Sequence, residues 1–235
     1  MKPATPVKDT PGLRRKVIQT CLELRDRWGL FVGPWGNASV RLETGILLTP
    51  TRMAYEEMSE EDLVVVGWDG RVVSGKRLPT SEGAAHRHLL RKRGEIGAFI
   101  HQHGPWSSVC ACAGASIPVI VEDMAQLVGG EVSCSRYVRG GEHERLGQAA
   151  AEAIGPEAWA VLLQSHGAMC GGRDIEEAAL CARILEKAAL IWVQARALGG
   201  ARLLPDESWR LERHRFLYQY GTAADFAAAE GGAPK

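Results

Sequence analysis

The sequence lacks a net charge, a long apolar run and a repeated cysteine motif. Lysine plus arginine equals aspartate plus glutamate at 28 each, so no basic excess indicates nucleic acid or an anionic membrane as the main partner. No apolar run reaches the roughly 18 residues of a membrane span. The N-terminal stretch MKPATPVKDTPG has no apolar segment typical of a signal peptide. These absences predict a cytoplasmic protein that binds neither nucleic acid nor membrane.

Cysteine spacing excludes a zinc finger and a disulfide scaffold. Of the six cysteines, only Cys110 and Cys112 are closely spaced, and no second pair follows. We interpret all six as reduced thiols, mostly small core fillers. The 235 residues also contain no repeat, no low-complexity segment and no clear linker. We therefore predict a single domain over residues 1–235.

What the sequence does contain is a mixture of hairpin and helix signals. The stretches NASVRL, GILLT and DLVVVGWDGRVV predict strands joined by short turns, and AWAVLLQSHGAMCGG predicts a buried strand with a hairpin return. Apolar periodicity and caps predict helices over about 10–28, 81–93, 142–154, 175–198 and 206–218, with a short one ending at Cys112. A cap from Thr80 or Ser81 is expected on the second helix. This pattern predicts an α/β fold whose mixed or largely antiparallel sheet is covered by helices.

The stretch EIGAFIHQHGPW, residues 95–106, ends an apolar strand with two histidines. Residues two apart on a strand point to the same face, so His101 and His103 can share one metal ion. Gly104-Pro105 ends the strand directly after them. VLLQSHGAMC repeats this logic with His166 before Gly167. Three imidazoles with an open coordination position are typical of a catalytic metal site, and imidazole accepts both Zn²⁺ and Mn²⁺.

The remaining histidines and one carboxylate complete the set of candidates. Glu82 follows two hydroxyl residues at a predicted helix start, where a capping role alone would explain it. His86 and His88 also have the H-x-H spacing, but on a helix they point about 200° apart, so we do not expect them to share a metal. His143 and His214 lie on predicted helices and are interpreted as surface or capping residues.

Five motifs together resemble one family. Along the chain occur G-N-x-S (Gly36 to Ser39), T-P-T (Thr49 to Thr51), T-S-E (Thr80 to Glu82), H-x-H (His101, His103) and a late H-G (His166, Gly167). This order resembles the class II aldolase/adducin-like family, which includes L-fuculose-phosphate aldolase, L-ribulose-phosphate 4-epimerase and related decarboxylases. The resemblance covers roughly residues 10 to 220.

The resemblance implies a fold, an assembly and a site. It implies one three-layer domain with a mainly antiparallel sheet of about nine strands, and a homotetramer with active sites between subunits. It assigns one divalent metal, Zn²⁺ or Mn²⁺, to His101, His103 and His166. It makes Glu82 the acid/base and a further ligand of the metal before substrate binds. Phosphate-binding positions correspond to Asn37, Thr51, Thr80 and Ser81, and Tyr220 corresponds to a C-terminal tyrosine that reaches the site.

Three features depart from the sugar-phosphate pattern. Arg52 stands where the aldolases usually have a glycine after T-P-T, and its guanidinium suits a carboxylate. Trp35 and Trp106 flank two of the motifs, either as core residues or as a flat apolar wall of the site. Glu122 or Asp123 falls where the fuculose-type aldolase has a catalytic tyrosine, unless the two only cap a helix.

These departures favour a decarboxylase of a hydroxylated aromatic or pyridine carboxylate. The metal would act as a Lewis acid on an enolate, and Glu82 would move the proton. The alternatives are an aldolase that cleaves a ketose 1-phosphate and, less favoured, a sugar-phosphate 4-epimerase. Each reading predicts a metal-dependent enzyme, a lyase in the two leading cases, whose partner is a small carboxylate or a phosphorylated sugar. A non-catalytic adducin-like module is disfavoured because the three histidines and Glu82 are all present.

Overall fold

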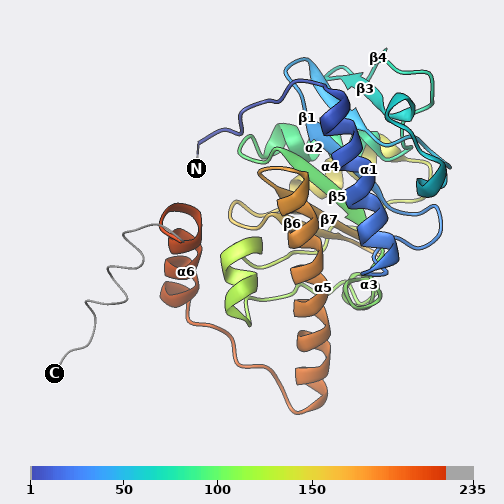
Figure 1. Cartoon of the computed structure of the whole chain (residues 1–235). Helices are drawn as coiled ribbons and strands as arrows, with labels where there is room; N and C mark the ends of the chain where they lie inside the picture. The colour runs from blue at the N-terminus through green and yellow to red at the C-terminus, as the bar shows by residue number, and fades with distance from the viewer. Residues whose placement is uncertain (1, 221–235) are drawn as a thin grey trace.

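The computed structural model describes residues 2–220, which form a seven-stranded antiparallel sheet between two layers of helices (Figure 1). The strands are β1 (Asn37–Arg41), β2 (Gly45–Leu48), β3 (Val64–Gly67), β4 (Val72–Ser74), β5 (Ala98–Gln102), β6 (Ala160–Leu163) and β7 (Gly167–Gly172). Their order across the sheet is β4-β3-β2-β1-β5-β7-β6, and every neighbouring pair is antiparallel. The expected α/β architecture is confirmed.

The helices follow the sequence signals closely. They are α1 (Pro11–Asp26), α2 (Gly83–Lys92), α3 (Pro105–Cys112), α4 (His143–Ala153), α5 (Ile175–Ala197) and α6 (Asp206–Tyr218). The Thr10 hydroxyl caps α1 by accepting from the Leu13 N–H at 3.2 Å, and the Asp174 carboxylate caps α5. Such caps satisfy N–H groups that have no partner within the helix.

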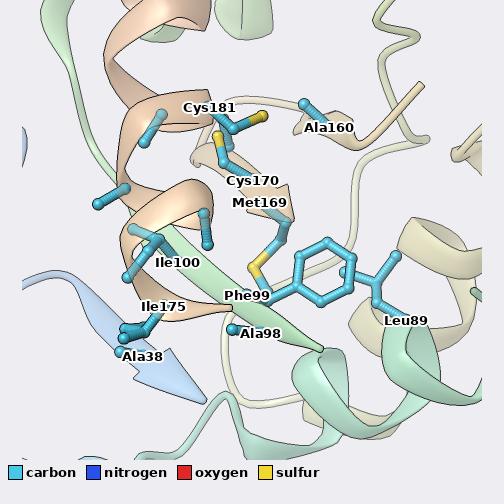
Figure 2. Close-up of a cluster of buried hydrophobic side chains, with 14 of the residues drawn as sticks. Ala38, Leu89, Ala98, Phe99, Ile100, Ala160, Met169, Cys170, Ile175 and Cys181 are labelled. Atoms are coloured by element: carbon cyan, nitrogen blue, oxygen red, sulfur yellow. The ribbon is translucent and has the colours of Figure 1, made fainter. Parts of the chain in front are cut away.

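The central strands are covered on both faces, as the alternation of side chains along β5 requires. In Figure 2, Phe99 lies beside Leu89 of α2, whereas Ile100 lies toward Ile175 and Cys181 of α5. Figure 1 shows α1 and α5 in front of the sheet and α2 and α4 behind it. His101 is two residues after Phe99 and therefore points toward the α2 layer.

Three local features differ from expectation. The sheet has seven strands rather than about nine, since Ile117 and Val132 form only an isolated bridge, as do Pro50 and Pro79. Proline has no N–H to extend such a bridge into a ladder. Helix α2 begins at Gly83, two residues later than expected, and no side chain caps it. Residues Met124–Val128 form a π-helical turn, η3, which no periodicity predicted.

All six cysteines lie in the described part of the chain and are free. Four of them, including Cys170 and Cys181, are buried among apolar neighbours, in agreement with the core role expected from sequence. Within residues 2–220, no helix is long and apolar enough to cross a membrane.

Candidate metal centre and active site

The sequence-predicted histidines meet at one edge of the sheet, where three central strands begin or end. β5 ends at Gln102 between the two histidines, while β1 begins at Asn37 and β7 begins at Gly167, directly after His166. In the antiparallel register, Asn37 lies opposite His101, and His101 lies opposite Met169. The pairing of β5 with β7 therefore brings the two distant histidine motifs together.

The three imidazoles form a compact cluster. Their ring centroids are 4.6 Å apart for His101 and His103, 4.8 Å for His101 and His166, and 5.1 Å for His103 and His166. One nitrogen from each ring lies within 4.8 Å of the other two. Among the described residues this is the one cluster of histidine, cysteine or acidic side chains that has metal-ligand spacing. His86 and His88 are not part of it, as expected.

The arrangement of acceptors at His101 fits a cation. The ring Nδ1 is 3.1 Å from the Ala168 carbonyl oxygen, so Nδ1 carries the proton and Nε2 presents a lone pair. That Nε2 faces a carboxylate oxygen of Glu82 at 3.2 Å. Two acceptors at this distance require a positive charge between them, either a proton or a metal ion. The second Glu82 oxygen lies 3.0 Å from Nε2 of His166.

The protonation states also suit a metal site, because ligands must be neutral imidazoles or ionised carboxylates. Burial lowers the pKa of His101, and it lowers the pKa of His103 to about 3. Burial raises the pKa of Glu82, but His101, His166 and Asn37 outweigh this effect and hold the pKa below its usual range. At neutral pH, Glu82 is therefore ionised and His103 is neutral.

Backbone geometry places Glu82 at this cluster. The residue immediately precedes α2 and adopts a conformation outside the helix, so its side chain is not aligned with the helix face. The Asn37 amide donates to its carboxylate at 2.6 Å. The Thr80 hydroxyl accepts from the Glu82 N–H at 3.4 Å, which fixes the preceding turn. Glu82 is thus directed at the histidines rather than used as a cap.

A cavity of about 780 Å³ opens onto the cluster. Nine of the residues predicted for the site line it: Trp35, Asn37, Thr51, Arg52, Thr80, Ser81, Glu82, His103 and His166. His101 lies behind this lining and is fully buried. Trp35 is 61% exposed, so it stands at the rim of the cavity instead of forming an inner wall.

Arg52 combines an unusual backbone with an unpaired side chain. Its φ is +53°, in the left-handed region where a side chain costs about 1 kcal/mol or more relative to glycine. Within residues 2–220, no acceptor pairs with its guanidinium. The loop thus holds a conformation that glycine favours, and it adds a free cation to the cavity wall.

Four predicted residues lie away from this cavity. Trp106 is partly buried against the core, and its backbone N–H donates to the Glu186 carboxylate of α5 at 2.6 Å. Glu122 is exposed, and Asp123 forms an ion pair with Lys187. Tyr220 is 64% exposed, with its ring 6.0 Å from that of Phe216. The structure does not bring these side chains together with the histidines of the same chain, and their predicted roles stay predictions.

Sequence reasoning missed a loop that covers one side of the cavity. Residues 137–143 line it, including Tyr137, Arg139 and His143. No motif marked this segment, although Gly140-Gly141 signals a loop and Gly141 has a φ of +92°. His143, expected at the surface or as a cap, is the first residue of α4 and faces the cavity.

This fold and site agree with what comparison with known proteins finds. The family model described as Class II Aldolase and Adducin N-terminal domain matches residues 15–193. The chain therefore belongs to the class II aldolase/adducin family, and its relatives are enzymes.

Among the relatives, 5-deoxy-D-ribulose 1-phosphate aldolase of Bacillus thuringiensis serovar kurstaki is 34% identical over 181 residues, covering 76% of this chain and 84% of its own length. L-ribulose-5-phosphate 4-epimerase UlaF of Salmonella paratyphi B is 30% identical over 224 residues, covering 90% and 96%. A solved L-fuculose 1-phosphate aldolase superposes with a TM-score of 0.84 at 30% identity, covering 89% and 98%. The relatives thus include both aldolases and epimerases of sugar phosphates.

Proposed function

We propose that this protein is a divalent-metal-dependent aldolase that cleaves a carbon–carbon bond of a ketose 1-phosphate. The observation that carries the proposal is the composition of one cavity. His103, His166 and Glu82 line it in front of the buried His101, and Thr51, Thr80, Ser81 and the unpaired Arg52 line its wall. The two sugar-phosphate aldolases at 30% identity or more support the same substrate class.

The chain's own residues would bind and orient such a substrate. His101, His103 and His166 would hold the metal, which as a Lewis acid withdraws electrons from substrate oxygens. The hydroxyls of Thr51, Thr80 and Ser81 would donate to phosphate oxygens, while Arg52 would add a charged fork. Because Asn37 already donates to Glu82, its side chain would act on the acid/base and not on the phosphate.

We assign to Glu82 the transfer of a proton to the substrate carbon C3. In the cleavage, the bond between C3 and C4 breaks, the C4 hydroxyl loses its proton, and the electron pair left on C3 takes up a proton. Glu82 is ionised and held beside the histidines, so it would first accept the proton that the C4 hydroxyl loses and then donate a proton to C3. The exposed Tyr220 could contact the C4 hydroxyl only if it reached into the site of a neighbouring copy of the chain.

This proposal replaces the decarboxylase favoured by the sequence. A decarboxylase of aromatic carboxylates would need a flat apolar wall in the cavity, and neither candidate tryptophan forms one. Trp106 is partly buried against the core, and Trp35 remains at the rim. The decarboxylase stays the second candidate on one observation: Arg52 keeps a strained backbone where glycine is usual, and a carboxylate would use its fork. The solved structure of YgbL from Klebsiella pneumoniae, 26% identical with a TM-score of 0.77, is described as a candidate aldolase, epimerase or decarboxylase.

The test assays one metal-loaded preparation on three kinds of substrate. L-fuculose 1-phosphate and 5-deoxy-D-ribulose 1-phosphate should release dihydroxyacetone phosphate. L-ribulose 5-phosphate reports epimerisation, and hydroxylated aromatic or pyridine carboxylates report CO₂ release. Release of CO₂ alone would promote the decarboxylase, and epimerisation without cleavage would promote the epimerase.

Metal dependence is tested separately by elemental analysis. We expect close to one Zn or Mn per chain, lost in the double variant His101→Ala/His103→Ala and kept in His88→Ala. His88 is a suitable control because it is a partly exposed residue that pairs with Glu144. Metal retained by the double variant would contradict the ligand assignment.

A further inference from the structure

A buried line of hydrogen bonds leads from Glu82 into the protein. The Asn37 Nδ2 donates to Glu82 Oε2 at 2.6 Å. The other end of the same amide, Oδ1, lies 2.6 Å from Nε2 of His86. On the far side of that ring, Nδ1 lies 2.7 Å from the Ser39 hydroxyl. His86 and Ser39 are both fully buried, so no water competes for these bonds.

The line follows from the spacing of four residues on two elements. Glu82 directly precedes α2, and the His86 N–H four residues later donates to the Glu82 carbonyl at 3.3 Å, so the two residues lie one turn apart. Asn37 and Ser39 are two apart on β1 and share one face of the strand. Because the two spacings are similar, side chains from the helix and the strand alternate along one line.

Donor and acceptor roles along this line can be assigned. A carboxylate only accepts, so the Asn37 amide must present its NH₂ group to Glu82. Its oxygen is then turned to His86, whose Nε2 must carry the ring hydrogen. Nδ1 is left to accept from the Ser39 hydroxyl. Burial lowers the pKa of His86 to about 3, so the ring is neutral and this is its single proton.

We propose that His86 is a positioning residue that holds the Asn37 amide so that the Glu82 carboxylate stays directed at His101 and His166. The other buried residues of α2 are the apolar Ala85, Leu89 and Leu90. If position 86 were needed only for packing, a leucine would fill it equally well. The effect on turnover rests on the proposed function, whereas the hydrogen-bond assignment does not.

The kinetic test compares His86→Leu, His86→Gln and Ser39→Ala with His88→Gln as a matched control on the same helix. His86→Leu should lower kcat roughly 10-fold to 100-fold, as for other groups that orient metal-site residues. KM should stay within about twofold, and metal content should not change. Gln places an NH₂ near the position of Nε2, so His86→Gln should recover part of the loss. Wild-type kcat in a folded His86→Leu protein would overturn the proposal.

A double-mutant cycle separates positioning from general structural damage. If His86 acts through Asn37, then adding His86→Leu to Asn37→Ala should lower kcat by less than about twofold further. A further loss equal to the full single-variant effect would show that His86 acts by another route, and it would overturn the proposal.

The last readout needs no substrate. In ¹⁵N-labelled protein, His86 should show the Nε2–H tautomer, and Ser39→Ala should weaken that preference because Nδ1 loses its donor. An Nδ1–H tautomer in the wild type would contradict the assignment even if the enzyme is active. If no substrate turns over but the Nε2–H tautomer is found, the proposed function fails while the hydrogen-bond line stands.

Discussion

Arg52 places two separable properties in one residue: a backbone conformation suited to glycine and a charged fork on the cavity wall. Arg52→Ala removes the fork but keeps a Cβ at positive φ, whereas Arg52→Gly removes both. We expect both variants to raise KM for the substrate roughly 10²-fold, since about 2.7 kcal/mol of charged hydrogen bonding corresponds to two decades. We expect the glycine variant alone to be stabilised, with a free energy of unfolding about 1 kcal/mol higher than that of the alanine variant.

Steady-state kinetics and thermal unfolding check these two effects independently. Arg52→Lys should rescue KM only in part, because an ammonium cannot form the bidentate fork. Unchanged KM in all three variants would remove Arg52 from the binding site. Equal stability of the alanine and glycine variants would contradict the strained conformation.

Glu82 should matter to turnover far more than to folding. Glu82→Gln keeps the shape of the side chain and removes its charge. We expect turnover to fall roughly 10²-fold or more, while the melting temperature shifts by no more than a few degrees. Near-normal turnover in this variant would count decisively against an acid/base role, and a large loss of stability would indicate a structural one.

At the scale of elements, α6 is held to the body of the protein by a buried arginine. Arg213 Nη1 donates to the carbonyls of Gln126 and Leu127 in η3, and its guanidinium lies 4.2 Å from the centroid of the Trp159 ring. Burial lowers the pKa of Arg213 to about 10, and the group remains charged at neutral pH. One guanidinium nitrogen, Nη1, reaches both carbonyls of the π-helical turn.

Lysine lacks the planar guanidinium that lies over the Trp159 ring, so Arg213→Lys should destabilise the protein by about 2 kcal/mol. The expected drop in melting temperature is roughly 4–8 °C for a chain of this size. Arg210→Lys on the same helix is the matched control, because its exposed ion pairs with Glu157 and Asp206 should contribute less than about 1 kcal/mol. Similar shifts in the two variants would show that Arg213 has no special role.

The elements also show why sequence patterns succeeded in some places and failed in others. The three histidines were identified because β5 is extended, so a spacing of two sets His101 and His103 on one face, and because His166 repeats the signal at the next strand edge. Trp106 was left open between core and site wall, and it is partly buried against the core because α3 begins at Pro105 and its backbone N–H donates to Glu186 of α5. The loop over residues 137–143 has no periodicity, so only the packed structure places Arg139 and His143 at the cavity.

For the whole molecule, we predict a homo-oligomer with the mass of a tetramer. The exposed apolar and aromatic side chains of the C-terminal segment support a covered surface there: Leu198, Leu203, Leu211, Tyr218 and Tyr220. A predicted role for Tyr220 also requires another copy, since it does not line the cavity of its own chain. Sedimentation at micromolar concentration should give about four times the chain mass of 25.5 kDa. A mass near that of one chain would contradict the prediction.

The pairing of β5 with β7 has a consequence for the order of events during synthesis. His101 bonds to Ala168, 67 positions further along the chain, and forming such a distant pairing is a slow step that closes a long loop. A nascent chain therefore offers no complete set of three imidazoles until β7 has emerged and paired. Metal should enter after the polypeptide has folded, so it should slow unfolding without speeding folding.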